Sequence, residues 1–284
     1  MISIPFCKFH GFGNDYIVIE KENVPANADL PKLARAICHR HTGAGADGIA
    51  VLESLHGEDA DYFCEIINPD GSIAGFSGNG TRCAVSYLYY RNLWKEENLR
   101  LRTRSGVKNF RLIDDSVDGT YWFEAEIGKP KFASSEVPIA TPEPYDSVID
   151  FPITAAGKEF LISGVNVGNP VACVFVDEFD PDWRTYGEAL ESHEAFPEKA
   201  NIVFVTVIDR ENIEIKIWER AAGETSSSGT CSAGAAILSA FTGRTDRDIA
   251  VHAEGGMTKV IWRDDDEIVI TGRADFAYRG DWPL

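Results

Sequence analysis

The chain has 284 residues, a formal net charge of −18 at pH 7, and 44% hydrophobic residues. This length suits one large domain or two of ordinary size, and the hydrophobic fraction is enough for real cores. The acidic balance argues against nucleic-acid and anionic membrane partners, because phosphate groups are bound by clustered Lys and Arg. No apolar run approaches a membrane span, and the first five residues lack the basic and apolar regions of a signal peptide.

The first half of the chain alternates predicted strands with two helices. A hairpin is predicted with its turn at residues 11–15, followed by an amphipathic helix over 30–39. A second, strongly apolar helix is predicted over 84–93. The remaining strands expected in this half are 49–52, 62–67, 100–103, 108–114 and 121–127.

The second half repeats this mixture after a Pro-rich stretch at 128–144, where we place a domain crossing. Helices are predicted over 183–192 and, as an Ala-rich apolar segment, over 233–241. Expected strands are 160–167, 172–176, 202–208, 213–218, 248–252, 257–262, 267–271 and 274–278. The predicted class is α+β, with domains 1–127 and 128–274 and with 275–284 returning to the first. The two central helices are apolar nearly all round, so a sheet is expected to wrap each of them.

Each apolar helix follows a strand, a turn and a Ser-Gly pair, at Ser77-Gly78 and Ser228-Gly229. Free backbone N–H groups at a helix start hold anions well, although serine is also an ordinary N-cap. The charged pair Glu219-Arg220 just before the second start favours a ligand site there, because small loop residues let a ligand approach the backbone. The two starts indicate a weak internal repeat, with two similar halves facing one cleft.

The six cysteines show neither Cys-x-x-Cys nor a His/Cys spacing typical of metal sites. Most lie in apolar runs, where a free cysteine behaves as a small hydrophobe. We therefore expect a reduced, cytoplasmic protein without a metal site.

Several motifs taken together resemble the diaminopimelate epimerase family over essentially the whole chain. They are residues 8–16 (KFHGFGNDY), 45–48 (GADG), 68–72 (NPDGS), 78–83 (GNGTRC), 168–170 (GNP), 191–194 (ESHE), 196–198 (FPE), Asn201 and 219–225 (ERAAGET). Each motif is weak alone, and their order is specific to the family.

The resemblance implies two similar α/β domains, each with a sheet round a central helix and with the active site between them. It implies a homodimer, a small amino acid as substrate, and inversion of its α-carbon by two cysteines without pyridoxal phosphate, metal or other cofactor. It further implies that five side chains hold the polar ends of the substrate: Asn14, Asn68, Asn169, Asn201 and Arg220. Backbone amides at two pairs would hold its α-carboxylate: Gly78-Asn79 and Gly229-Thr230.

The chain departs from the family at three of four acid–base positions. Ser77 and Ser228 stand where the family has its cysteines, and Val171 stands where it has the histidine that partners the first of them. Only the glutamate partner of the second cysteine is present, as Glu219. A thiol has a pKa of about 8.5 and is readily ionised at a helix N-terminus, whereas a serine hydroxyl needs a neighbouring base.

The residues therefore predict one-sided proton transfer. Ser228 has Glu219, while Ser77 has no partner that the sequence identifies. Cys231 is not expected to replace Ser228, because three residues along a helix displace a side chain by about 4.5 Å. Three functions stay open: an epimerase or racemase with altered acid–base groups, a one-base lyase or isomerase that uses Glu219 on another amino acid, and an amino acid-binding paralogue without activity.

Overall fold

The computed structural model describes residues 3–55, 57, 59–220 and 222–283. Met1, Ile2 and Leu284 of the termini, and Ala221 of the second helix-start motif, lie outside the described residues. Contacts divide the chain into two compact units, residues 1–126 with 271–284 and residues 127–270. No helix within the described residues is both long and apolar enough to cross a membrane.

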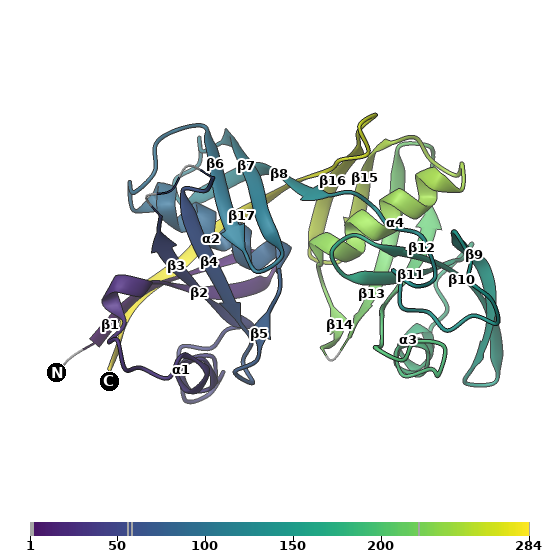
Figure 1. Ribbon diagram of the computed structural model, residues 1–284, viewed down its shortest axis with the longest axis horizontal. Coiled ribbons are helices and arrows are strands. Elements are labelled where there is room, and N and C mark those ends of the chain that lie inside the picture. The colour runs from purple at the N-terminus through teal and green to yellow at the C-terminus, as the bar shows by residue number, and fades with distance from the viewer. Residues whose placement is uncertain (1–2, 56, 58, 221, 284) are drawn as a thin grey trace. The chain divides into compact units, whose positions relative to one another are not determined.

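Unit 1 holds eleven elements and the C-terminal part of one more (Figure 1). They are β1 (Ser3–Gly11), β2 (Asn14–Glu20), η1 (Lys21–Asn23), α1 (Leu30–Ile37), β3 (Gly48–Ser54), β4 (Tyr62–Ile67), β5 (Ile73–Ala74), α2 (Gly78–Tyr90), β6 (Asn98–Thr103), β7 (Gly106–Asp114), β8 (Thr120–Gly128) and the end of β17 (Ile268–Pro283).

Unit 2 holds the remaining elements and the beginning of β17. They are β9 (Val148–Ala155), β10 (Lys158–Asn166), β11 (Pro170–Phe175), α3 (Trp183–Glu191), β12 (Asn201–Val207), β13 (Asn212–Glu219), β14 (Gly223–Thr225), α4 (Gly229–Phe241), β15 (Asp248–Ala253) and β16 (Gly256–Trp262).

The two units share one order of strand pairing. In unit 1, β2 pairs parallel with β3, β3 antiparallel with β4, and β4 parallel with β6. In unit 2, β11 pairs parallel with β12, β12 antiparallel with β13, and β13 parallel with β15. A short helix follows the first strand of each set, and the central helix follows the third. The prediction of two similar α+β halves is therefore confirmed.

Each central helix packs against the strands of its own unit. In α4, every residue from Gly229 to Ser239 is buried, because strands β10–β13, β15 and β16 contact it. In α2, every residue from Asn79 to Leu88 is buried, with β1–β4 around it. A helix surrounded in this way has no solvent-facing stripe, which explains why its sequence shows little apolar periodicity.

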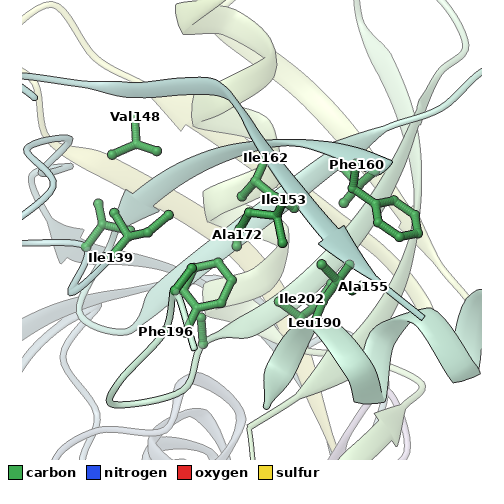
Figure 2. Close-up of a cluster of buried hydrophobic side chains, with 14 of the residues drawn as sticks. Ile139, Val148, Ile153, Ala155, Phe160, Ile162, Ala172, Leu190, Phe196 and Ile202 are labelled. Atoms are coloured by element: carbon green, nitrogen blue, oxygen red, sulfur yellow. The ribbon is translucent and has the colours of Figure 1, made fainter. Parts of the chain in front are cut away.

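A second apolar layer in unit 2 lies between the sheet and α3. Figure 2 shows Ile153, Phe160 and Ile162 of β9 and β10 gathered with Leu190 of α3 and Ile202 of β12. Since β12 contacts both α3 and α4, it is covered by a helix on each face. Strands β12 and β13 are antiparallel, with Ile202 paired to Trp218, so Asn201 at the start of β12 and Glu219 at the end of β13 lie at the same end of the pair.

The sequence misassigned two elements. The strands predicted at 267–271 and 274–278 are one long strand, β17, which passes through Gly272 without a break. Gly272 interrupts the apolar pattern because the Arg82 guanidinium occupies the space where its side chain would be. Strand β9 was missed because Pro152 lies within it, and proline lowers strand propensity. Helix α2 begins at Gly78 directly after its Ser77 cap, as the Ser-Gly pair predicts, so the apolar segment predicted from residue 84 is only its later part.

Candidate active site

Ser77 forms the N-cap of α2 in unit 1. Its hydroxyl accepts a hydrogen bond from the Gly80 amide at 3.1 Å, and its carbonyl accepts from the Thr81 amide at 2.9 Å. The amides of Gly78 and Asn79 precede the Thr81 amide, the first donor of an intrahelical hydrogen bond, so they are available to an anion. The Tyr16 hydroxyl of β2 lies 2.9 Å from Ser77 Oγ, in hydrogen-bond contact. The structure thus gives Ser77 a hydroxyl neighbour that the sequence did not identify.

Asn14 begins β2 and is held by an ionic network. Its amide nitrogen donates to Asp47 Oδ2 at 2.9 Å, and Asp15 and Asp47 exchange side chain–backbone hydrogen bonds. Arg40 donates to both Asp15 oxygens at 2.7 and 2.8 Å, and Lys8 Nζ lies 2.6 Å from Asp15 Oδ2. Burial alone would raise the pKa of Asp15, but the hydrogen bonds from Arg40 and Lys8 outweigh it and lower that pKa. The network therefore fixes the β1–β2 turn on which Asn14 sits.

Asn68 and Asn79 are also fixed from within unit 1. Asn68 donates from its side chain to Ser72 Oγ at 2.9 Å, in the tight turn that follows β4. Asn79 Oδ1 accepts from Arg82 Nη1 at 3.1 Å, one turn along α2. Complete burial lowers the pKa of Arg82 to about 10. Arg82 therefore orients Asn79 from inside the protein rather than from solvent.

Ser228 forms the N-cap of α4 in unit 2, and its hydroxyl donates to Glu219 Oε1 at 2.5 Å. This is the charge-assisted type of hydrogen bond, which is short and strong. Gly229 and Thr230 supply the first amides of α4, and both residues are buried. The structure thus brings together Ser228 and Glu219, and it places the predicted amide pair beside them.

Cys231 lies at the same carboxylate as Ser228. Its Sγ is 4.0 Å from Glu219 Oε1, although one helical turn separates it from the N-cap. Residues three apart lie on one helix face, so Cys231 shares the carboxylate with Ser228, but its side chain is fully buried, and the expectation that it does not replace Ser228 stays a prediction. Burial, and then the Glu219 charge, raise the pKa of the Cys231 thiol well above its usual range. The thiol is therefore protonated near neutral pH.

Asn201, at the start of β12, links two of the predicted binding segments. Its amide nitrogen donates to the Pro170 carbonyl at 3.2 Å, and its oxygen accepts from the Arg220 amide at 2.9 Å. The Arg220 side chain donates to the Glu198 carbonyl at 3.0 Å. Asn169 lies in the turn just before β11 and is half-buried. Asn201 thus positions both segments within unit 2.

Val171 packs inside unit 2. It is fully buried, and a side-chain carbon added at Gly234 of α4 would lie 2.8 Å from it. An aliphatic side chain can neither accept nor donate a proton, so the structure provides no acid–base group at this position. Among the described residues, no group of three or more His, Cys, Asp or Glu side chains is placed to share a metal ion.

Tyr16 is the residue near a candidate site that sequence reasoning missed. It belongs to the motif at 8–16, in which the resemblance assigns a substrate-binding role to Asn14. The internal repeat carried the missing signal, since Tyr16 stands two residues after Asn14 as Val171 stands two after Asn169. Applying the repeat residue by residue would have pointed to this position.

Comparison of the sequence with protein families matches diaminopimelate epimerase over residues 6–132 and 163–277. The diaminopimelate epimerase of Moorella thermoacetica is 37% identical over 284 residues, covering 98% of this chain and 99% of that protein. The diaminopimelate epimerase of Pelotomaculum thermopropionicum is 35% identical over 281 residues, with 98% of each chain covered.

Solved structures share the fold at lower sequence identity. A hydroxyproline epimerase from Agrobacterium vitis, with trans-4-hydroxy-L-proline bound, superimposes with a TM-score of 0.71 at 17% identity, covering 99% of this chain and 91% of that one. A Bacillus anthracis protein of the PhzF family gives a TM-score of 0.70 at 16% identity, with both chains fully covered. These likenesses confirm the predicted fold.

Proposed function

Since this chain belongs to the diaminopimelate epimerase family, we propose that it inverts the α-carbon of a free amino acid without a cofactor, and that diaminopimelate is the substrate. The observation that carries this proposal is the Ser228–Glu219 hydrogen bond of 2.5 Å at the start of a buried helix. It places a proton-accepting carboxylate behind the hydroxyl that stands at one family cysteine position. The surrounding binding motifs of the family are present as well.

The binding residues divide by the charge that they complement. The first amides of α2 and α4 suit a carboxylate, because helix N-termini concentrate unpaired N–H groups and partial positive charge. The Arg220 guanidinium suits a second carboxylate through a bidentate pair. The side chains of Asn14, Asn68 and Asn169 supply both donors and acceptors for ammonium and carboxylate groups. Diaminopimelate carries two of each group, which fits this set.

The proton on the substrate α-carbon is removed in one concerted step on the Ser228 side. Ser228 Oγ takes that proton while its own passes to Glu219, so Glu219 ends neutral and no free alkoxide forms. The electron pair stays on the α-carbon, where amides around the adjacent carboxylate stabilise the developing charge. Because a hydroxyl is a much weaker acid than a thiol, we expect turnover slower than about 10 s⁻¹, a typical enzyme value.

The test is to incubate LL- and meso-diaminopimelate separately with the protein in D₂O, and to follow α-deuteration by NMR and stereochemistry by chiral chromatography. Glu219→Gln should abolish deuteration of the isomer whose α-hydrogen faces Ser228, and with it inversion, and leave calorimetric binding intact. Glu224→Gln is the matched control, since Glu224 lies in strand β14, which pairs with the end of β13, and its carboxylate pairs with Arg184 on the surface. Failure of the unaltered protein to deuterate either isomer, or an active Glu219→Gln variant, would refute the proposal.

A second function is favoured by the unequal partners of the two serines. Ser228 has a carboxylate and Ser77 has only a phenol hydroxyl within reach among the described residues. A one-base lyase or isomerase acting on another amino acid would use the Ser228 side alone. Deuteration of a single isomer with retention, and without inversion, is the result that selects this function.

We also propose a cytoplasmic homodimer, in line with the resemblance to the family. All six cysteines are free thiols, as a reducing compartment would keep them. Light scattering coupled to gel filtration tests the assembly, and a mass near that of one 31.3 kDa chain would contradict it.

A further inference from the structure

The hydrogen bond between Tyr16 and Ser77 joins the end of the motif at 8–16 to the N-cap of α2. The two oxygens lie 2.9 Å apart, and Tyr16 is only 6% exposed. From this geometry we propose that Tyr16 is the proton partner of Ser77, taking over on that side the task that Glu219 performs for Ser228. The inference rests on the proposed function and names a positioning residue for it.

Two glycines form a slot for the Tyr16 ring. A Cβ added at Gly48 would lie 2.8 Å from Tyr16 Cε1, and one added at Gly80 would lie 2.9 Å from the same atom. Gly48 is the strand partner of Tyr16 in β3, and Gly80 lies in the first turn of α2. Any side chain at either position would push the ring away. The sequence therefore leaves space for a large ring beside Ser77 from two separate elements.

The same three positions in unit 2 are filled differently. Val171 stands for Tyr16, and its strand partner is Asn201, where unit 1 has Gly48. Three residues after Ser228 comes Cys231, where unit 1 has Gly80 after Ser77. An aromatic ring would find no slot there. The tyrosine and its two glycines thus form a set that belongs to unit 1 alone.

The proton partners of the two serines come from strands that do not correspond in the two units: Tyr16 from β2, and Glu219 from β13, whose counterpart in unit 1 is β4. Ile66 pairs with Ala74 three residues before Ser77, as Ile217 pairs with Thr225 three residues before Ser228. By this register, Glu219 of unit 2 corresponds to Asn68 of unit 1, which is not an acid. The residue of unit 1 in line with Glu219 is therefore an amide, and the side chain that contacts Ser77 is a phenol from β2, which β3 separates from β4.

The phenol can complete the inversion that begins on the Ser228 side. Ser77 Oγ gives its proton to the electron pair on the α-carbon, a C–H bond forms, and the Tyr16 hydroxyl proton passes to Ser77 in the same step. Tyr16 ends as phenolate and Glu219 as a neutral acid, and proton exchange with solvent restores both. In the reverse direction, the phenolate accepts the Ser77 proton while Ser77 removes the α-hydrogen. Neither direction needs a free alkoxide.

Buried tyrosine hydroxyls usually have a hydrogen-bond partner. The test must therefore distinguish a purely structural hydrogen bond from proton exchange between Tyr16 and Ser77. Tyr16→Phe keeps the ring in its slot and removes only the hydroxyl oxygen. We expect inversion to fall at least 100-fold, as is usual for loss of an acid–base group. Deuteration with retention should persist for the isomer whose α-hydrogen faces Ser228, and should stop for the other. Ser77→Ala should match Tyr16→Phe, and the double variant should be no worse, because the two groups act as one unit.

A second readout responds only to the acidity of the phenol. Replacing Tyr16 by 3-fluorotyrosine should move the alkaline limb of the inversion rate to lower pH, because the more acidic phenol loses its proton earlier. Tyr89→Phe is the control, since its hydroxyl binds the Glu96 carbonyl at 2.6 Å at the far end of α2. Its pH profile and inversion rate should equal those of the unaltered protein.

The outcomes separate this inference from the proposed function. Normal inversion by Tyr16→Phe would overturn the role of Tyr16 and leave the epimerase function standing. Deuteration of only one isomer by the unaltered protein would overturn both the role of Tyr16 and inversion, and would select the one-base function. Absence of deuteration with both isomers would overturn the proposed function itself.

Discussion

Gly80 offers a stability test of the packing that holds Tyr16 against Ser77. In an unobstructed helix, Gly→Ala stabilises by about 0.8–1.0 kcal/mol. Here the added Cβ would lie 2.9 Å from Tyr16 Cε1, 3.0 Å from Ile66 Cδ1 and 3.1 Å from Ser77 Oγ. Overpacking of this kind costs about 1–3 kcal/mol, so Gly80→Ala should destabilise the protein by up to about 2 kcal/mol.

Removing the ring should reverse the sign. In a Tyr16→Ala background, the closest obstacle to the new methyl group is gone, and the tip of Ile66 can move aside. Gly80→Ala should then stabilise by up to about 1 kcal/mol, its intrinsic helix preference. The difference between the two backgrounds predicts a coupling energy of about 1–3 kcal/mol, within the range measured for residues in contact.

The assay is urea unfolding of the four proteins of this double-mutant cycle, followed by circular dichroism and evaluated by linear extrapolation. A parallel cycle with Tyr89→Ala is the control, because Tyr89 lies at the opposite end of α2 and should show no coupling to Gly80. Equal stabilisation by Gly80→Ala with and without Tyr16 would refute the slot.

Three further predictions address binding, acid stability and core packing. Arg220→Lys should weaken calorimetric binding of diaminopimelate, because a bidentate pair with a carboxylate is lost; unchanged affinity would remove Arg220 from the site. Asp15 has a lowered pKa when folded, so it contributes stability above its unfolded pKa of about 3.9, and this contribution is lost as pH falls through the folded value. The stability gap between the unaltered protein and Asp15→Asn should therefore narrow below about pH 4 in pH-dependent urea unfolding, and a constant gap would contradict this. Ser86→Ala should stabilise by about 1 kcal/mol in thermal unfolding, since Ser86 Oγ is buried with no hydrogen-bond partner among the described residues; destabilisation would reveal an overlooked contact.

The sequence by itself determined the family, the α+β class and the two helix starts. These follow from local signals: small residues around a Ser-Gly cap, alternating strands, and apolar segments whose faces are buried all round. The Glu219 partner of Ser228 was also predicted, through the family resemblance, and in the chain only the short strand β14 and its flanking turns separate the two. Such contacts lie close in sequence and depend little on the remaining fold.

Only the tertiary structure decided what stands behind Ser77. Tyr16 and Ser77 are 61 residues apart, and their contact requires parallel pairing of β2 with β3 and burial of α2 against both. The ring also fits only because Gly48 of β3 and Gly80 of α2 carry no side chain. The neighbourhood of Cys231 had the same origin, since strand β13 brings the Glu219 carboxylate within 4.0 Å of the Cys231 thiol, a contact that the spacing along α4 does not predict. Non-local packing therefore decides which groups can exchange protons with the two serines, while local sequence decides where those serines stand.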